Sequence, residues 1–273
     1  MKIDTAQEAI FSSTLRITKK GKSDLGTSIG TGFIFEASID DIRKQFVLFL
    51  VSNRHVFGNS FETISFNFHK AKDDYSGPDL GKVVVFESEA LPHHEHPDQN
   101  VDLACINITG AEFGAPGNSV YYKHLTDKLV SDFTEDDLLP GKEVWFVGYP
   151  ENRFDVIHNL PILRKGYIAS MPKIDFNARK EFVIDAQVFP GSSGSPVFAV
   201  LNGKFKLIGI IAKTMIRNQE LETLPAGFNL GIQQIIGLGI VIKATAFKEL
   251  VECAVKEYKL RIEEKERLRM TRK

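Results

Sequence analysis

Short apolar runs, broken by glycine, proline and asparagine, recur along most of the 273 residues. Runs of this length are typical of buried β-strands, whereas helices need longer segments with a 3.6-residue period. Many short strands joined by turns predict closed or sandwiched antiparallel sheets. The predicted strands are Phe46–Val51, Thr63–Phe68, Lys82–Phe86, Asp102–Ile108, Glu143–Gly148, Glu181–Val188, Pro196–Val200, Phe205–Ala212 and Leu238–Lys243.

Two segments depart from the strand pattern. Residues 110–140 contain Pro116, Gly117 and an acidic stretch, which predict a connecting loop with a short helical or turn segment. From residue 245 the period becomes helical, with apolar residues at Phe247, Leu250, Val251, Ala254, Val255 and Tyr258. The charged segment Lys259–Lys273 is predicted to be a solvated helix end that frays, with a docking element for a partner as the alternative.

Three separate fragments carry residues that fit a single chemistry. They are Ser52-Asn53-Arg54-His55-Val56, Val101-Asp102-Leu103-Ala104-Cys105 and Phe189-Pro190-Gly191-Ser192-Ser193-Gly194-Ser195-Pro196. A serine hydroxyl is a weak nucleophile at neutral pH, so it needs an imidazole as general base and a carboxylate to orient that imidazole. His55, Asp102 and Ser193 are predicted to fill these roles. Gly191 lets the backbone curl so that its N–H and that of Ser193 form an oxyanion hole.

These residues and their order resemble the trypsin/chymotrypsin-like serine peptidases, and more closely the bacterial-type, HtrA-like peptidase domains. The resemblance covers roughly residues 25 to 245, and it also rests on Gly30-Thr31-Gly32-Phe33, Gly141–Pro150, Arg164–Ala169 and Gly237–Ile242. It implies an all-β, chymotrypsin-like fold of two antiparallel Greek-key β-barrels with a C-terminal α-helix.

The resemblance also implies a division of the chain. We expect a first barrel in residues 1–125 that carries His55 and Asp102. A linker and a second barrel with Ser193 and the oxyanion hole are expected in residues 126–244, followed by a helix and charged tail in residues 245–273.

Substrate preference is predicted by the same resemblance. Gln187 stands six positions before Ser193, where trypsin-type enzymes place an aspartate, so strict specificity for Lys or Arg is not expected. Asp185 lies close by in the sequence, so a negatively charged specificity pocket is the alternative. The residues expected to bind substrate are Gln187, Ile211, Ala212, Lys213 and Thr214.

Two residues beside the nucleophile depart from the family pattern. Ser195 stands where glycine is common, and Ser192 stands where Asp or Asn is usual, so both bear on the shape of the oxyanion loop. No Arg- or Lys-terminated site is followed by an Ile-Val-Gly-Gly-like start, so activation by proteolysis is not expected. Control is instead expected to come from the substrate, a regulatory partner or self-assembly.

A histidine cluster offers a competing interpretation. His93, His94 and His96 lie near Asp98, and imidazole and carboxylate groups suit zinc. Pro92 and Pro97 mark the segment as an irregular loop, and no second ligand cluster accompanies it. We therefore favour a polar surface loop, and we expect no metal and no other cofactor.

Composition and cysteine content suggest the setting. A formal net charge of −1 predicts no general attraction to nucleic acid or acidic membranes. No run approaches the roughly 18 apolar residues of a membrane span, and the first ten residues lack the apolar stretch of a signal peptide. Cys105 and Cys253 are the only cysteines. They favour a reducing, cytoplasmic compartment, with Cys105 as a structural thiol rather than a redox group.

The sequence therefore predicts an intracellular serine endopeptidase that cleaves protein or peptide substrates through an acyl-enzyme intermediate. The alternative is a catalytically silent protein of the same fold that binds peptides or acts as a scaffold.

Overall fold

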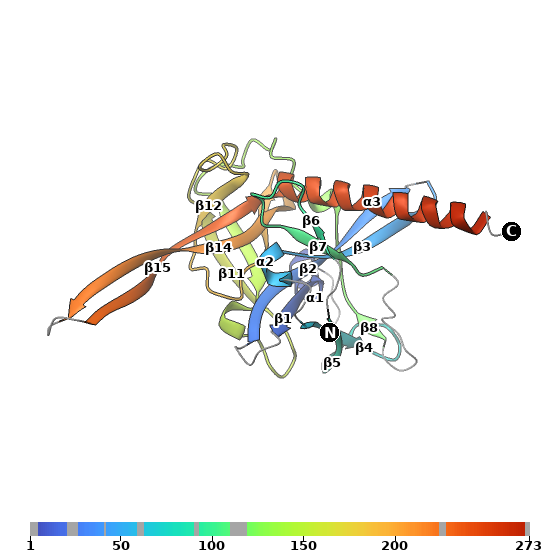
Figure 1. The fold of residues 1–273 in the computed structure, drawn as a ribbon, viewed down its shortest axis with the longest axis horizontal. Coiled ribbons are helices and arrows are strands. Elements are labelled where there is room, and N and C mark those ends of the chain that lie inside the picture. The colour runs from blue at the N-terminus through green and yellow to red at the C-terminus, as the bar shows by residue number, and fades with distance from the viewer. Residues whose placement is uncertain are drawn as a thin grey trace.

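The computed structural model describes residues 5–20, 27–40, 42–58, 63–89, 93–109, 119–223 and 228–270. The described chain consists mainly of strands, which form one open sheet and one closed barrel. A long C-terminal helix, α3 (Ala244–Met270), runs across both (Figure 1). The predicted all-β fold with a C-terminal helix is confirmed.

The first sheet has nine strands. Its order is β5-β4-β1-β2-β3-β7-β6, with β8 paired to β4 and β9 paired to β2. Among the described residues no pairing joins β6 to β5, so this sheet is open where the sequence predicted a first barrel. The strands are β1 (Thr14–Lys20), β2 (Thr27–Asp40), β3 (Gln45–Ser52), β4 (Thr63–Ala71), β5 (Pro78–Glu89), β6 (His94–Glu95), β7 (Ala104–Asn107), β8 (Val120–Tyr121) and β9 (Leu125–Thr126).

Two short helices flank these strands. Helix α1 (Ala6–Ser13) precedes β1 and begins with a capping box between Thr5 and Glu8, which satisfies its first backbone N–H groups. Helix α2 (Arg54–Phe57) is a single turn that directly follows β3.

The second sheet closes into a barrel of order β10-β11-β12-β15-β14-β13. Buried apolar side chains from alternate strand positions fill its interior, including Val144, Phe146, Phe182 and Ile184. The strands are β10 (Glu143–Gly148), β11 (Ile162–Ile168), β12 (Glu181–Asp185), β13 (Pro196–Leu201), β14 (Lys204–Thr223) and β15 (Phe228–Lys243).

Strands β14 and β15 are much longer than predicted. Beyond the barrel they continue to pair from Ile216–Ile235 to Thr223–Phe228, and they project from the body as a two-stranded arm (Figure 1). Polar residues and glycine interrupt the apolar pattern in this part of the sequence. The strands extend there because backbone hydrogen bonds hold a hairpin without requiring an apolar face.

The charged C-terminal segment is also more regular than predicted. Helix α3 continues to Met270 rather than fraying from Lys259, and residues 271–273 lie outside the described part of the chain. Glutamate, lysine and arginine are good helix formers, and Glu257 pairs with Arg261 one turn later at 3.9 Å.

The predicted linker is only partly described. Residues 110–118 lie outside the described ranges, and β8, β9 and the short 3₁₀ helix η1 (Asp127–Leu129) follow. A second 3₁₀ turn, η2 (Pro150–Asn152), comes directly after β10 and leads into a loop at residues 153–161.

One buried histidine joins this loop to the first sheet. The Nε2 atom of His69 on β4 lies 3.0 Å from the carbonyl oxygen of His158. Burial lowers the pKa of His69 from its ordinary value of 6.5, although the hydrogen bonds to the backbone at His158 and Asn159 oppose this shift.

This lowered pKa predicts a loss of stability in mild acid. The unfolded chain takes up a proton on His69 near pH 6.5, whereas the folded chain resists it. The contribution of His69 is therefore complete above that pH and is lost as the pH falls toward the folded pKa. We expect the free energy of unfolding, measured in urea at pH 7 and pH 5, to fall more in the wild type than in His69→Gln. Equal falls in the two proteins would contradict this.

Candidate active site

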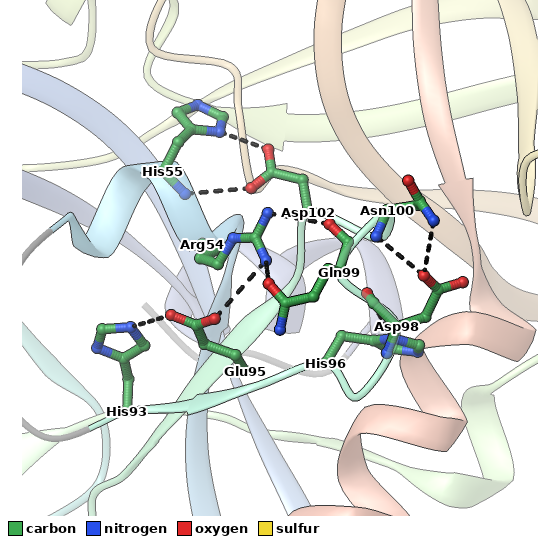
Figure 2. Close-up of polar contacts among 9 residues, drawn as sticks. All are labelled: Arg54, His55, His93, Glu95, His96, Asp98, Gln99, Asn100 and Asp102. Atoms are coloured by element: carbon green, nitrogen blue, oxygen red, sulfur yellow. Dashed lines mark hydrogen bonds and ion pairs between the residues drawn. The ribbon is translucent and has the colours of Figure 1, made fainter.

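His55 and Asp102 meet because the strands that lead to them are neighbours. His55 lies in α2 just after β3, and Asp102 lies just before β7, which pairs with β3 at Ser52 and Ala104. The Nδ1 atom of His55 is 2.5 Å from Oδ2 of Asp102, and the backbone N–H of His55 donates to Oδ1 at 3.1 Å (Figure 2). The carboxylate thus contacts both the ring and the backbone of His55, and the ring contact fixes the Nδ1 proton on the Asp102 side.

Ser193 lies in the loop between β12 and β13. Its hydroxyl donates to the carbonyl oxygen of Ala212 on β14 at 3.1 Å, and among the described residues it makes no hydrogen bond to His55. The neighbouring Gly194 packs against the Thr31 carbonyl and the Ser52 hydroxyl. Because Ser52 closely precedes His55, the serine loop and the histidine lie at the same junction between the sheet and the barrel.

The serine loop leaves two backbone donors without acceptors. Gly191 and Gly194 have φ values of 89° and 86°, a region that favours glycine. The N–H groups of Ser192 and Ser195 donate within the loop, to Phe189 and Ser192 respectively. In the described part of the chain, the N–H groups of Gly191 and Ser193 have no acceptor. They are the donors predicted for the oxyanion hole.

A buried threonine that the sequence analysis did not single out joins the two sheets here. The Thr31 backbone N–H donates to the backbone carbonyl of Ser193 at 2.8 Å. The Thr31 Oγ1 donates to the Gly191 carbonyl at 2.7 Å. The same Oγ1 accepts from the Tyr149 N–H at 3.2 Å, and its carbonyl accepts from the Ser52 hydroxyl at 2.6 Å. The sequence feature that could have pointed to Thr31 is a polar residue that stands between two glycines in an apolar strand.

The segment before Asp102 is also held from the histidine side. Asn53 Nδ2 donates to the Asp102 carbonyl at 2.8 Å. The Arg54 guanidinium donates to the side-chain and backbone oxygens of Gln99 at 2.9 and 3.2 Å and lies 3.6 Å from Glu95 (Figure 2). The residues on both sides of the His55–Asp102 pair are therefore connected to each other.

Comparison with known proteins bears on this arrangement. The model of the trypsin-like peptidase domain matches residues 30–210, which is well over half of the chain. The chain belongs to the trypsin-like peptidase family. The order of sheet, barrel and helix agrees with the chymotrypsin-like fold that the sequence predicts.

Two solved structures align with most of this chain at low sequence identity. An HtrA-type protease, AlgW with a tripeptide, is 16% identical with a TM-score of 0.49, and the alignment covers 91% of this chain and 62% of that chain. The active form of the Rv3671c protease from M. tuberculosis is 17% identical with a TM-score of 0.48, covering 92% and 87%. The peptidase thus spans less than two thirds of the AlgW chain. A comparison with curated proteins found no match.

The residues predicted to bind substrate differ in their placement. Ala212 touches the nucleophile through its carbonyl, and Lys213 is exposed beside it. The side chain of Ile211 is wholly buried in the barrel core, so it cannot line a substrate pocket, and only its backbone reaches the serine loop. Thr214 is half-buried, and its hydroxyl has no hydrogen-bond partner among the described residues.

Gln187 and Asp185 lie on the outside of the barrel. Both are exposed and alternate with the buried residues Ala186 and Val188, as expected for an extended segment. The two side chains therefore leave the same face of the segment, and neither enters the barrel interior.

The hydroxyls of Ser192 and Ser195 are both buried and lack hydrogen-bond partners among the described residues. The Ser195 hydroxyl lies over Gly148 of β10, where an added Cβ would overlap it. The serine that replaces the family's usual glycine is thus accommodated by a glycine on the opposite strand.

A cavity with charged residues in its wall lies beside the segment that precedes Asp102. It has a volume of about 300 Å³ and lies between residues 98–101 and residues 175–181, with Ile242 at its side. Burial raises the pKa of Glu181 in its wall, and Asp102 adds to the rise, whereas Lys213 and Arg179 oppose it. Charges from both sheets therefore act on one another next to the His55–Asp102 pair.

The histidine cluster is not the polar surface loop that the sequence favoured. His94 pairs with Glu257 of α3 at 2.8 Å, and His96 is buried. The segment is covered because α3 packs beside β6, a contact that local sequence does not encode. Within the described ranges, no group of three or more His, Cys, Asp or Glu side chains could hold a metal ion.

The cysteines are free in the described structure. Burial raises the pKa of the Cys105 thiol, so that it stays protonated and is a poor nucleophile. This favours the structural interpretation of Cys105. No helix in the described part of the peptidase is long and apolar enough to cross a membrane.

The hydroxyl of Thr31 gives a direct test of the junction. Thr31→Val keeps the shape of the side chain but leaves the Gly191 carbonyl and the Tyr149 N–H without a partner. We expect a loss of about 1–3 kcal/mol in the free energy of unfolding. Labelling of Ser193 by a fluorophosphonate should also slow. Thr31→Ser, which retains the hydroxyl, should lose much less in both measurements, and equal losses in the two variants would contradict the role of the hydroxyl.

Proposed function

We propose that this member of the trypsin-like peptidase family cleaves protein or peptide chains with the triad Ser193, His55 and Asp102. The observation that carries the proposal is the double contact of Asp102 with the His55 ring and backbone. This contact orients the imidazole of a general base, and a structural histidine on an exposed turn would have no need of it.

The proposed reaction proceeds through an acyl-enzyme. Ser193 Oγ attacks the substrate carbonyl carbon while its proton passes to Nε2 of His55. The N–H groups of Gly191 and Ser193 stabilise the oxyanion of the tetrahedral intermediate. His55 then returns the proton to the leaving amine as the C–N bond breaks. Water repeats the sequence on the ester and releases the second product.

We propose that the structure corresponds to a resting state of this triad, in which Ser193 is not hydrogen-bonded to His55. With the Ser193 hydroxyl donating to Ala212, a rotation about its χ1 must precede proton transfer to His55. We propose that substrate binding accompanies this rotation. The same hydrogen bond favours the second candidate function, a catalytically silent peptide-binding protein in which the serine stays turned away.

Substrate preference follows from the exposed residues beside the serine loop. Neutral Gln187 takes the position where trypsin-type enzymes have an aspartate, so we propose a peptidase without strict preference for basic residues. Its two free cysteines suit a reducing compartment, and we propose that it works inside the cell.

Labelling with a fluorophosphonate probe tests the triad, because the probe reacts only with an activated serine. We expect the wild-type protein to be labelled and Ser193→Ala to be unlabelled. In Asp102→Asn the His55 tautomer is no longer fixed, so the labelling rate should fall by roughly 10³- to 10⁴-fold.

Two further measurements separate the candidate functions. A peptidase should degrade an added unfolded protein and leave fragments with new N-termini, which mass spectrometry identifies. A binding protein would shield the same substrate without cleaving it. Absence of labelling in wild-type protein that binds peptides would overturn the peptidase proposal in favour of the silent alternative.

A further inference from the structure

The Asp102 carboxylate sits in a short, tightly closed turn between β6 and β7. The His96 N–H donates to the Leu103 carbonyl at 2.9 Å and closes the ends of the turn. Within it, Val101 donates to the Asp98 carbonyl at 3.0 Å, and Asn100 donates to the Asp98 carboxylate at 2.9 Å. The position of Asp102 therefore depends on the turn as a whole.

Burial does not hold the catalytic pair in place. The side chain of His55 is 53% exposed and that of Asp102 is 33% exposed. A half-exposed imidazole has no close packing to restrict its rotamers, so its alignment depends on the Asp102 carboxylate. His96, Val101 and Leu103 are buried within the turn, and His96 is the only polar side chain among these three, so it can anchor the turn to the body of the protein by a directional contact.

The ring of His96 has a defined orientation. Its Nδ1 accepts from the backbone N–H of Asp98 at 3.0 Å, although the Asp98 carbonyl also lies 3.3 Å away. The shorter contact places the ring proton on Nε2. That Nε2 is buried, has no hydrogen bond among the described residues, and faces the Glu249 carboxylate of α3 at 3.5 Å.

Glu249 is itself held from the barrel side. The ammonium of Lys180 donates to both of its carboxylate oxygens, at 2.5 and 2.6 Å. Lys180 directly precedes β12, and its carbonyl accepts from the Lys243 N–H at the end of β15. Glu249, in the first turns of α3, thus lies between the Asp102 turn and the barrel.

A parallel contact aligns the strand before the turn. His94 on β6 pairs with Glu257, about two helical turns further along α3 than Glu249. His94 and His96 point to the same side, as alternate residues do in an extended segment. The two histidine–glutamate contacts therefore fix the direction in which the chain enters the Asp102 turn.

We propose that Glu249 is a positioning residue for the triad, which acts through His96 to hold Asp102 against His55. This inference rests on the proposed function for its effect on catalysis. The contact to Glu249 prevents the His96 ring, and with it the turn, from shifting away from α2. Loss of the contact displaces the carboxylate by a fraction of an ångström and misaligns the base.

Glu249→Gln tests this role because it keeps the size of the side chain and removes its charge. We expect the saturating rate of fluorophosphonate inactivation to fall about ten- to a hundredfold, with the half-saturating probe concentration nearly unchanged. Glu252→Gln is the matched control, since Glu252 is an exposed residue of the same helix and makes no hydrogen bond or ion pair with the described residues of the turn. It should react like the wild type.

A double-mutant cycle identifies the route of the effect. His96→Gln should slow inactivation to a similar degree, and the double variant should be no slower than either single variant. If the fold-changes in inactivation rate of the two single variants multiply in the double variant, Glu249 does not act through His96, and its effect comes from Lys180 or from general stability. Wild-type rates in Glu249→Gln would also overturn the proposal.

A proton NMR measurement separates this proposal from the proposed function. The downfield signal of the His55 Nδ1 proton, assigned by its loss in His55→Ala, reports the contact with Asp102 whether or not the protein is labelled. We expect this signal to broaden or shift upfield in Glu249→Gln while the melting temperature stays unchanged. An unchanged signal would overturn the positioning role even in an active peptidase. A changed signal in a protein that no probe labels would leave the role intact and count only against the peptidase.

Discussion

The hydrogen bonds of one buried residue, Thr31, determine how the open sheet meets the barrel. All of its polar groups are used within the junction, toward Ser193, Gly191, Tyr149 and Ser52. Ser193 and Gly191 belong to the serine loop, Tyr149 follows β10 and Ser52 ends β3, so the threonine sets the distance between the serine loop and the strand that leads to His55. Burial strengthens these bonds and makes any orphaned partner costly.

The strand that carries Thr31 also supports the C-terminal helix. Further along β2, Phe35 packs edge-on against Phe247 of α3 with ring centroids 4.8 Å apart, and Phe33 lies beside the same ring at 5.7 Å. Strand β2 therefore joins the oxyanion loop to the helix that carries Glu249. The helix is fixed by apolar packing at its start, and this packing allows its glutamates to meet the histidines before Asp102.

Much of this architecture could be predicted from short-range pattern. Phe46–Val51 and Glu143–Gly148 form strands at the predicted positions, because most of their residues are buried and leave a short apolar run in the sequence. The order of His55, Asp102 and Ser193 indicated the family. The arm of β14 and β15 was missed because its sequence lacks an apolar period. The contact of His96 was missed because its partner, Glu249, lies far away in the chain and meets it only in the folded state.

In the proposed mechanism, the hydrogen bond between Ser193 and the Ala212 carbonyl has a thermodynamic consequence for every reaction at this serine. Only molecules whose hydroxyl has turned from that carbonyl to His55 can react, so any intrinsic acylation rate is multiplied by the fraction of molecules in the turned state. That fraction is a property of the protein alone and is common to all acylating reagents. A substrate gains selectivity over a simple reagent when its own backbone N–H groups compete for the carbonyl, since its binding then shifts the population as well as supplying the reactive group.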